Sequence, residues 1–311
     1  MKHKISFLLP AHNEGKIIAK TLANLMNLSY DNYEVIIGLD GCTDDTENIV
    51  KTCDLLYPGK LRYFKLNLRQ GKPAVINSII KHATGDIIII NDADWIFRVE
   101  SQEAIERFLS AFDDPSVGGI CENNALEFEE IRLRTGNLGF KMVAYSSQLW
   151  YEYQKKEFTS TEGNMGYLNE PAMFLTNVFR KTLFKPNESL GDDFERTNDI
   201  LDAGKKIVIP LDEDSPRFIP VYDSISIKDL FKLKIRTAIA REQVQSKRLL
   251  PKYYYPKAVW YILSRSWKYG IGVGLMMIFW IALTTCATVI GKFKYKQGVS
   301  TKEGWKIRAK R

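Results

Sequence analysis

The strongest constraint on the fold is a repeated alternation of short apolar runs with helical patterns over the first 125 residues. The apolar runs at 5–9, 34–39, 61–66 and 85–90 each end in a polar loop, and the first three loops lead into segments with helical spacing. This alternation is typical of βαβ units, whose strands lie parallel in one sheet. The carboxyl ends of such strands meet at one edge, so the four polar loops are predicted to converge there.

The last of these runs carries the most specific signal. Residues 87–95 read IIIINDADW. Four consecutive isoleucines are apolar on both faces, which indicates a short central strand covered by helices on both sides. Asp92 and Asp94 then lie at its carboxyl end, where two repelling carboxylates are a reason to expect a metal ion or a proton between them. A solvated turn in which Asp acts as a turn former is the alternative interpretation.

Charge is divided unevenly along the chain. Of 44 Lys+Arg and 37 Asp+Glu, 19 and 3 lie from Lys228 to the end, which leaves 25 and 34 for residues 1–227. A body of charge −9 therefore precedes a basic tail of charge +16. Such a tail attracts nucleic acid or anionic lipid. The apolar content of the tail favours lipid, and no nucleic-acid partner is predicted.

An uncharged run at 271–291 lies inside this basic part. As a helix it is about 31 Å long, close to the hydrocarbon thickness of a bilayer, and the flanking Trp267 and Lys292 suit a membrane interface. We therefore expect membrane lipids as partners, with a buried soluble helix as the alternative. A single crossing would separate the tail from the body, whereas a re-entrant hairpin from Ala258 would leave both on the cytosolic side. The sequence leaves both arrangements open.

Cysteine usage and the first residues bear on the compartment. Cys42, Cys53, Cys121 and Cys286 form no paired spacing typical of disulfides or a zinc site. The first residues turn polar too soon for a signal peptide. We therefore expect a reduced catalytic body on the cytosolic face of a membrane.

Five polar segments carry a family resemblance. They are PAHNEG (10–15), DGCTDDT (40–46), LRQGKPAVIN (68–77), INDADW (90–95) and GDDFER (191–196). In this order and spacing they resemble the inverting family 2 glycosyltransferases, over about residues 4–245. The resemblance implies an α/β fold of the GT-A type, a Rossmann-like, mostly parallel sheet flanked by helices. It also implies a nucleotide-diphosphate sugar as the donor.

The donor-binding residues follow from the first loops. The resemblance places the nucleoside near Pro10, Ala11, Glu14 and Asp40, and Asp40 could accept a hydrogen bond from a base or a ribose hydroxyl. A plain turn at 40–41 is the alternative for Asp40. Lys72 follows a glycine at the start of a helix, where phosphate oxygens are favoured. A solvated lysine is the alternative there.

Asp92 and Asp94 resemble the Asp-x-Asp motif of the family. The resemblance implies Mg²⁺ or Mn²⁺, which bind proteins through one or two carboxylates together with phosphate and water. A bound metal would offset the charge that develops on the leaving diphosphate. We predict Asp94 as a metal ligand, with Asp92 binding the metal or the nucleotide.

Asp192 and Asp193 match the acidic pair whose second member is the general base in the family. A base is needed because an acceptor hydroxyl must lose its proton as it attacks the anomeric carbon, and direct displacement inverts the configuration there. Asp192 could instead cap the following helix. Residues assigned to the acceptor are Asn177, Asp192 and Arg241.

One motif departs from many relatives, notably the processive synthases. Where these carry Gln-x-x-Arg-Trp, this chain has Leu233, Arg236 and Thr237. Arg236 could still bind the diphosphate, with attraction to anionic lipid as the alternative. The missing Gln and Trp favour transfer of a single sugar over polymer synthesis.

Three parts are predicted along the chain. They are a catalytic domain at 1–222, a basic amphipathic interfacial helix within 223–250, and a membrane-associated segment with a basic tail at 251–311. Residues 158–170 are interpreted as a mobile loop near the acceptor.

The resemblance thus implies a membrane-associated inverting glycosyltransferase, with a donor that is most often UDP-linked in the family. The acceptor would be a hydroxyl of a lipid-linked saccharide or glycan, or alternatively a polyprenyl phosphate. A haloacid-dehalogenase-like phosphatase is the alternative from another class, because it also uses Asp-x-Asp after an apolar strand. That class places the motif on its first strand, whereas several βαβ units precede Asp92.

Overall fold

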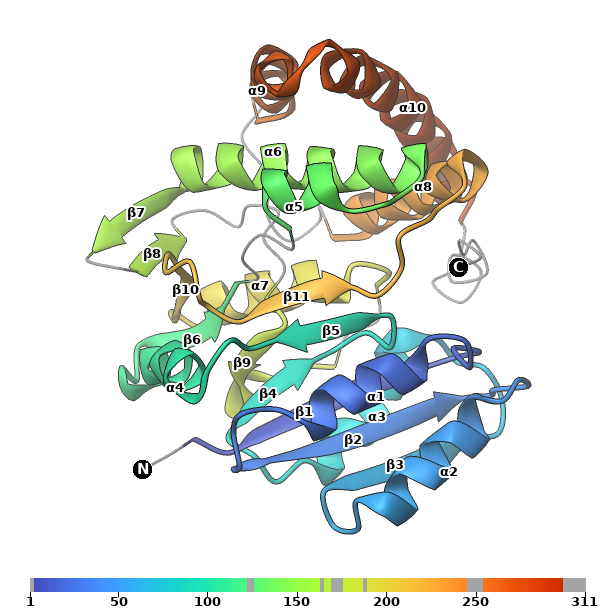
Figure 1. Ribbon diagram of the computed structural model, residues 1–311, viewed down its shortest axis with the longest axis vertical. Helices are drawn as coiled ribbons and strands as arrows, with labels where there is room; N and C mark the ends of the chain where they lie inside the picture. The colour runs from blue at the N-terminus through green and yellow to red at the C-terminus, as the bar shows by residue number, and fades with distance from the viewer. Residues whose placement is uncertain are drawn as a thin grey trace.

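The computed structural model describes residues 3–121, 126–162, 165–168, 176–186, 189–244 and 254–298. These residues form a mixed nine-stranded sheet, of order β3-β2-β1-β4-β9-β6-β10-β8-β7, and a two-stranded sheet of β11 and β5 (Figure 1). The strands are β1 (Ile5–Ala11), β2 (Tyr33–Asp40), β3 (Leu61–Leu66), β4 (Ile87–Ile90), β5 (Trp95–Arg98), β6 (Val117–Ile120), β7 (Thr159–Glu162), β8 (Met165–Leu168), β9 (Val178–Arg180), β10 (Lys206–Pro210) and β11 (Arg217–Pro220).

Helices cover both faces of the large sheet. Side chains of α1, α2 and α4 fill the core on one face, and those of α3 and α7 pack on the other. The α-helices are α1 (Ile18–Met26), α2 (Thr46–Leu56), α3 (Lys72–Ile79), α4 (Gln102–Ser110), α5 (Phe128–Leu133), α6 (Leu138–Phe158), α7 (Asp192–Asp202), α8 (Ile227–Val244), α9 (Tyr254–Ser266) and α10 (Ile271–Lys296).

The amino-terminal half is the predicted parallel sheet. β1 pairs in parallel with β2 and β4, and β2 pairs in parallel with β3. Ile87 and Ile89 pack into one core, while Ile88 and Ile90 pack into the core on the opposite face. They alternate because successive side chains of a strand point to opposite faces. The predicted α/β class with a mostly parallel sheet is confirmed.

The carboxyl-terminal half adds strands of mixed direction. β9 runs antiparallel to both β4 and β6, and β10 runs parallel to β6 but antiparallel to β8. The expectation of a loop at 158–170 is wrong for its described residues, because β7 and β8 pair as an antiparallel hairpin. The run Thr159–Glu162 contains β-branched threonines that suit a short polar edge strand.

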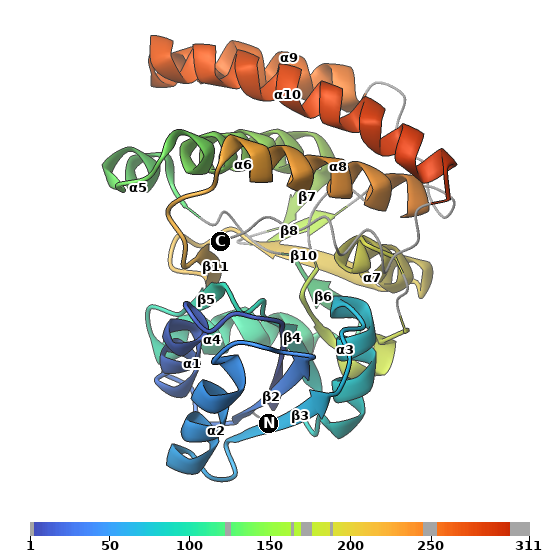
Figure 2. The same cartoon turned by 90° about the vertical axis from the view of Figure 1, so that its right-hand side faces the viewer.

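Two layers of helices lie over one side of this α/β body (Figure 2). α6 and α8 form the inner layer, and α9 and α10 run across it as the outer layer. Among the described residues, α10 is the one helix long and apolar enough to cross a membrane, with a mean hydropathy of 2.2. Only 22% of the most apolar stretch of α10 is buried, which is low for the core helix of a soluble protein.

Gly38 of β2 lies where α3 packs closely on the sheet. A Cβ added there would lie 2.2 Å from Cγ1 of Val75 and 3.1 Å from Cγ2 of Ile79. We therefore expect Gly38→Ala to lower the free energy of unfolding by about 1–3 kcal/mol, as overpacked cores do. The control is Gly272→Ala, because beyond the local backbone of α10 no atom lies within 4 Å of the added Cβ. Equal denaturation midpoints for the two variants would contradict this account of the packing.

Candidate active site

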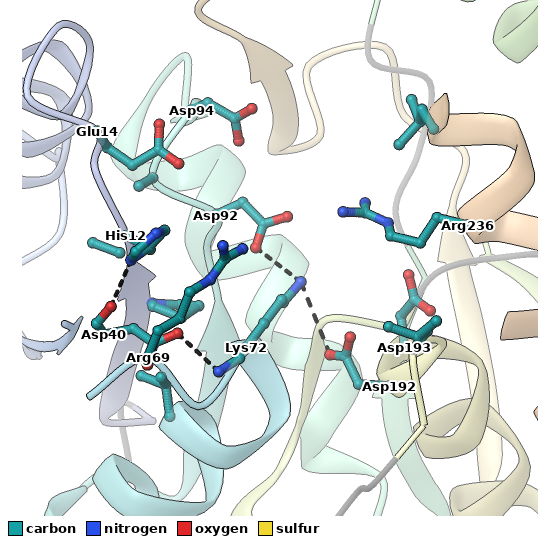
Figure 3. Close-up of a pocket in the computed structure, with 17 residues that line it drawn as sticks. His12, Glu14, Asp40, Arg69, Lys72, Asp92, Asp94, Asp192, Asp193 and Arg236 are labelled. Carbon is teal, nitrogen blue, oxygen red and sulfur yellow. Dashed lines mark hydrogen bonds and ion pairs between the residues drawn. The ribbon is translucent and has the colours of Figure 1, made fainter. Parts of the chain in front are cut away.

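The polar loops converge on one pocket at the carboxyl edge of the parallel strands, and α8 lines it from the other side (Figure 3). Strand ends, loops and helix starts from distant parts of the sequence all contribute. The pocket is lined by Pro10, Ala11, His12, Glu14, Asp40, Arg69, Gly71, Lys72, Val75, Asp92, Ala93, Asp94, Leu190, Asp192, Asp193, Leu233 and Arg236.

Asp40 ends β2 and anchors the loop between β3 and α3. Its carboxylate accepts hydrogen bonds from the backbone N–H groups of Gln70 (2.6 Å) and Gly71 (2.8 Å). Gly71 has a φ of +98°, which favours glycine, and α3 begins at the following residue, Lys72. Asp40 therefore fixes the loop that directs Lys72 into the pocket. Its contact with a nucleoside, through its remaining lone pairs, stays a prediction.

The backbone that carries Asp92 and Asp94 is held by polar contacts. The buried Asn91 side chain donates a hydrogen bond to the carbonyl of Asp92 (2.9 Å). The carbonyl of Asp94 accepts one from the N–H of Val221 (2.9 Å). Asp92 and Asp94 therefore lie on a loop whose backbone is fixed by these hydrogen bonds.

Lys72 lies between acids from two different loops. Its Nζ is 2.8 Å from Oδ1 of Asp92 and 3.9 Å from Oδ2 of Asp192. Burial alone would lower the pKa of Lys72, but Asp192, Asp92 and Asp193 together hold that pKa above its usual value. Lys72 is therefore a cation at neutral pH, at the first turn of a helix where phosphate oxygens are favoured.

Asp192 and Asp193 open α7. Oδ2 of Asp192 accepts a hydrogen bond from Arg196 (2.9 Å), and both side chains are buried. Asp193 is half-buried and accepts a hydrogen bond from the N–H of Phe194 (2.8 Å). Burial and the neighbouring Asp192 raise the pKa of Asp193 to about 6, although Lys72 and Arg196 act in the opposite direction. Such a carboxyl is ionised at neutral pH and is a stronger base than an ordinary aspartate.

α8 supplies the opposite wall of the pocket. Leu233 and Arg236 line the pocket from this helix, and Arg236 extends into it in Figure 3. Burial lowers the pKa of Arg236, an effect that Asp92, Asp192 and Asp193 oppose. The boundary proposed at 222 therefore separates residues that share one pocket.

Comparison with known proteins identifies the family. Residues 6–183, more than half of the 311-residue chain, match the family model described as Glycosyl transferase family 2. The chain belongs to this family. Membership of this family indicates a glycosyltransferase rather than the phosphatase alternative.

Two curated relatives show how far the similarity of this glycosyltransferase extends. It is 32% identical over 149 residues to a poly-beta-1,6-N-acetyl-D-glucosamine synthase of Staphylococcus aureus (strain COL). This alignment covers 46% of this chain and 33% of that protein. It is 35% identical over 99 residues to the probable glycosyltransferase YdaM of Bacillus subtilis (strain 168). This second alignment covers 29% of this chain and 23% of that protein. The aligned part thus spans about a third or less of each relative.

A solved structure shares the fold. A mannosyltransferase from Pyrobaculum calidifontis, in complex with GDP-Man and Mn²⁺, matches with a TM-score of 0.57 and 17% identity. The match covers 98% of this chain and 88% of that one. The likeness agrees with the GT-A fold that the motifs implied.

The structure of this glycosyltransferase brings together all but two of the predicted site residues. Asn177 and Arg241 do not line the pocket. The Asn177 side chain instead accepts a hydrogen bond from Arg196 (3.0 Å). Arg241 lies two helical turns after Lys234, on the face of α8 that meets Trp280 of α10. Their roles at the acceptor remain predictions without support from this geometry.

Two charged or polar pocket residues were missed from the sequence. His12 follows Pro10 and Ala11 in the first motif, and its Nδ1 lies 2.6 Å from the carbonyl oxygen of Asp40. Arg69 precedes Lys72 in the third motif and lines the pocket beside it. His12 lies in the segment 10–15 and Arg69 in the segment 68–77. Their positions inside these two motifs were therefore the signal that could have predicted them as pocket residues.

The acids of the pocket suit a divalent metal only in part. Among the residues that the structure describes, no group of three or more His, Cys, Asp or Glu side chains could hold a metal by itself. Asp92 and Asp94 offer hard carboxylate oxygens to the same pocket. Two carboxylates completed by phosphate oxygens and water are the usual surroundings of Mg²⁺, so the donor set fits a metal that binds together with a diphosphate.

Proposed function

We propose that this chain is a membrane-associated, inverting glycosyltransferase. It moves one sugar from a nucleotide-diphosphate sugar, UDP-linked, to a hydroxyl of a lipid-linked or glycan acceptor. One observation carries the proposal. A single pocket contains a carboxyl with a raised pKa, Asp193, together with the Asp92 and Asp94 carboxylates and the cations Lys72 and Arg236. These are the groups that direct displacement of a diphosphate requires.

The donor side of the reaction uses the first four loops. Asp92 and Asp94 would hold Mg²⁺ or Mn²⁺, which supplies charge stabilisation for the leaving diphosphate when it is bound. Lys72 and Arg236 place two cations beside the same space and would bind phosphate oxygens. Lys72 pairs with Asp92 in this structure. When the donor binds, its phosphate oxygens would replace part of the contact of Lys72 with Asp92.

The acceptor side uses Asp193. This carboxylate would take the proton from an acceptor hydroxyl as the oxygen attacks the anomeric carbon from the face opposite the diphosphate. The anomeric configuration is then inverted in one step. A polyprenyl phosphate acceptor is already ionised and would not need this base, so the base distinguishes the two acceptor classes.

Transfer of a single sugar is supported by α8. Leu233 and Thr237 stand where processive relatives carry Gln and Trp, and Leu233 lines the pocket with an apolar side chain. The Staphylococcus aureus relative is named as the synthase of a polymer, but the alignment covers 33% of it. The proposal of single transfer therefore rests on this chain's own α8.

Product analysis tests the proposal. The full chain is incubated with Mn²⁺, a panel of uridine and guanosine diphosphate sugars, and lipid-linked or free glycan acceptors. We expect one donor to be consumed and the proton NMR spectrum of the product to show the anomeric configuration opposite to that of the donor. Retention of configuration would contradict the mechanism, and product chains longer than one added sugar would contradict single transfer.

A further inference from the structure

The apolar helix α10 contacts the body of the protein along most of its length. Met277 and Trp280 belong to a buried cluster with Phe140 of α6. Near the other end of the helix, a Cβ added at Gly291 would lie only 2.5 Å from Cβ of Ala238 of α8. The helix between Met277 and Gly291 is about 21 Å long. A helix that projected away from the body would contact it at one end only.

Charged side chains of α8 lie directly beside α10. Nζ of Lys234 is 5.2 Å from the centre of the Trp280 ring, near the middle of α10. Nζ of Lys292 is 3.4 Å from Oε1 of Glu242. If α10 crossed a bilayer in this arrangement, Lys234 and much of α8 would lie at the depth of the hydrocarbon, where charged side chains are costly. The packing therefore conflicts with a crossing.

The opposite face of α10 is apolar and exposed. Leu275, Phe279, Val289 and Phe293 are 58%, 49%, 64% and 63% exposed, and Trp260 of α9 is 74% exposed. The spacing of the four α10 residues places them along one stripe of the helix. The inner face of α10 packs on α6 and α8, whereas the outer apolar stripe is exposed and available to a partner.

A groove between α6 and α9, lined also by the exposed Trp260, carries more cations than acids. Lys156 of α6 and Lys257, Arg265 and Lys268 line it with one acid, Glu157, and Arg265 pairs with Glu152 of α6 (3.4 Å). The segment 254–298 contains no Asp or Glu at all. Clustered cations beside exposed apolar and aromatic side chains are complementary to anionic lipid headgroups over an acyl layer.

We propose that α9 and α10 lie flat on a leaflet that contains anionic lipid, so that α10 does not cross the bilayer. The outer stripe of α10 enters the acyl layer, and the groove between α6 and α9 holds lipid phosphates. This arrangement rests on the proposed membrane association and defines its form. It leaves both ends of α10 on one side of the membrane, the side that carries the catalytic pocket.

Labelling of the two ends of α10 tests the orientation. Lys268→Cys, at an exposed charged position just before α10 and outside its apolar stripe, and Gln297→Cys are made separately in a chain whose Cys42, Cys53 and Cys286 are replaced by Ser, while Cys121 is buried and is kept. Membrane vesicles with the cytosolic face outward are treated with a membrane-impermeant maleimide. We expect both variants to be labelled without detergent. Labelling of one variant only after detergent is added would show a crossing and overturn the proposal.

Vesicle binding tests the surface itself. Deleting the helices would uncover the core that Met277 and Trp280 fill, so point variants of the full chain are used. We expect Phe279→Glu to weaken binding to phosphatidylcholine–phosphatidylglycerol vesicles by about tenfold or more. The control, Leu55→Glu, changes an 82% exposed side chain of α2 and should bind normally. Equal binding of the two variants would overturn the proposal.

The cationic groove has its own expected result. The double variant Lys257→Gln and Lys268→Gln should bind the anionic vesicles roughly thirtyfold more weakly, at about fivefold per lysine, and neutral vesicles unchanged. An unchanged affinity for anionic vesicles would overturn the role of the groove. Donor consumption in detergent is measured in parallel for the variants and for the unmodified chain. If the unmodified chain consumes no donor, the transferase proposal is refuted. If the unmodified chain consumes donor but does not bind vesicles, only the membrane surface is refuted.

Discussion

We expect Asp193→Asn to lower kcat by about 10²–10⁴-fold, the usual contribution of a general base. The amide keeps the size of the side chain but cannot take the acceptor proton. Donor binding should be unchanged, because Asp193 acts on the acceptor. Steady-state rates with a hydroxyl acceptor, together with donor affinity measured by calorimetry, check both statements. Near-normal turnover would contradict the base and favour a phosphate acceptor.

The pH dependence provides a second test of the same residue. Burial and Asp192 raise the pKa of Asp193 to about 6, and only the ionised form can accept a proton. We therefore expect kcat/KM to fall as the pH drops below about 6 and to be level above it until another group titrates. Asp192→Asn removes the charge that raises this pKa, so it should move the acid limb to lower pH. An acid limb in the same position would contradict the coupling of the two acids.

We expect Asp94→Ala to remove metal-dependent donor binding and to lower turnover by about 10³-fold, since electrostatic groups at a leaving oxyanion contribute on this scale. Asp94 is 5% exposed and lies in the pocket beside Ala93 and Asp92. Removing its carboxylate should leave Asp92 unable to hold the metal alone. Calorimetric titration of the donor with Mn²⁺ and with EDTA measures the effect.

The matched control for Asp94 is Asp45→Ala. Asp45 is exposed and makes no side-chain capping hydrogen bond to the backbone of α2, so donor affinity should be unchanged. Activity of the unmodified enzyme that persists in EDTA would contradict the role of a metal. Loss of donor binding in Asp45→Ala would show that the effect is not specific to the pocket.

The parallel half of the fold could be predicted because its signals are local. The run Ile87–Ile90 is apolar on both faces, and only a central strand buries both. The hairpin of β7 and β8 could not be predicted in the same way, because Thr159–Glu162 is polar and its pairing with Met165–Leu168 depends on the edge that β10 offers. Edge strands are set by their neighbours rather than by their own pattern.

The site could be predicted where a charged residue type stands at a strand end or a helix start. Asp92 and Asp94 follow β4, Lys72 follows a glycine at the start of α3, and all three share the pocket. Asp40 lines the pocket as predicted, but its hydrogen bonds to the N–H groups of Gln70 and Gly71 depend on tertiary structure that no spacing reveals. The same holds for α10, whose composition suits a membrane span, while its packing on α8 depends on tertiary structure.

The most direct test of the central claim is calorimetric titration of the full chain with a panel of nucleotide-diphosphate sugars in Mn²⁺, in Mg²⁺ and in EDTA. The pocket of Asp92, Asp94, Lys72 and Arg236 predicts saturable binding of one diphosphate sugar that requires the metal and is lost in Asp94→Ala. Absence of binding to every donor, by protein shown to be folded, would contradict the assignment of this pocket as a metal-assisted nucleotide-sugar site.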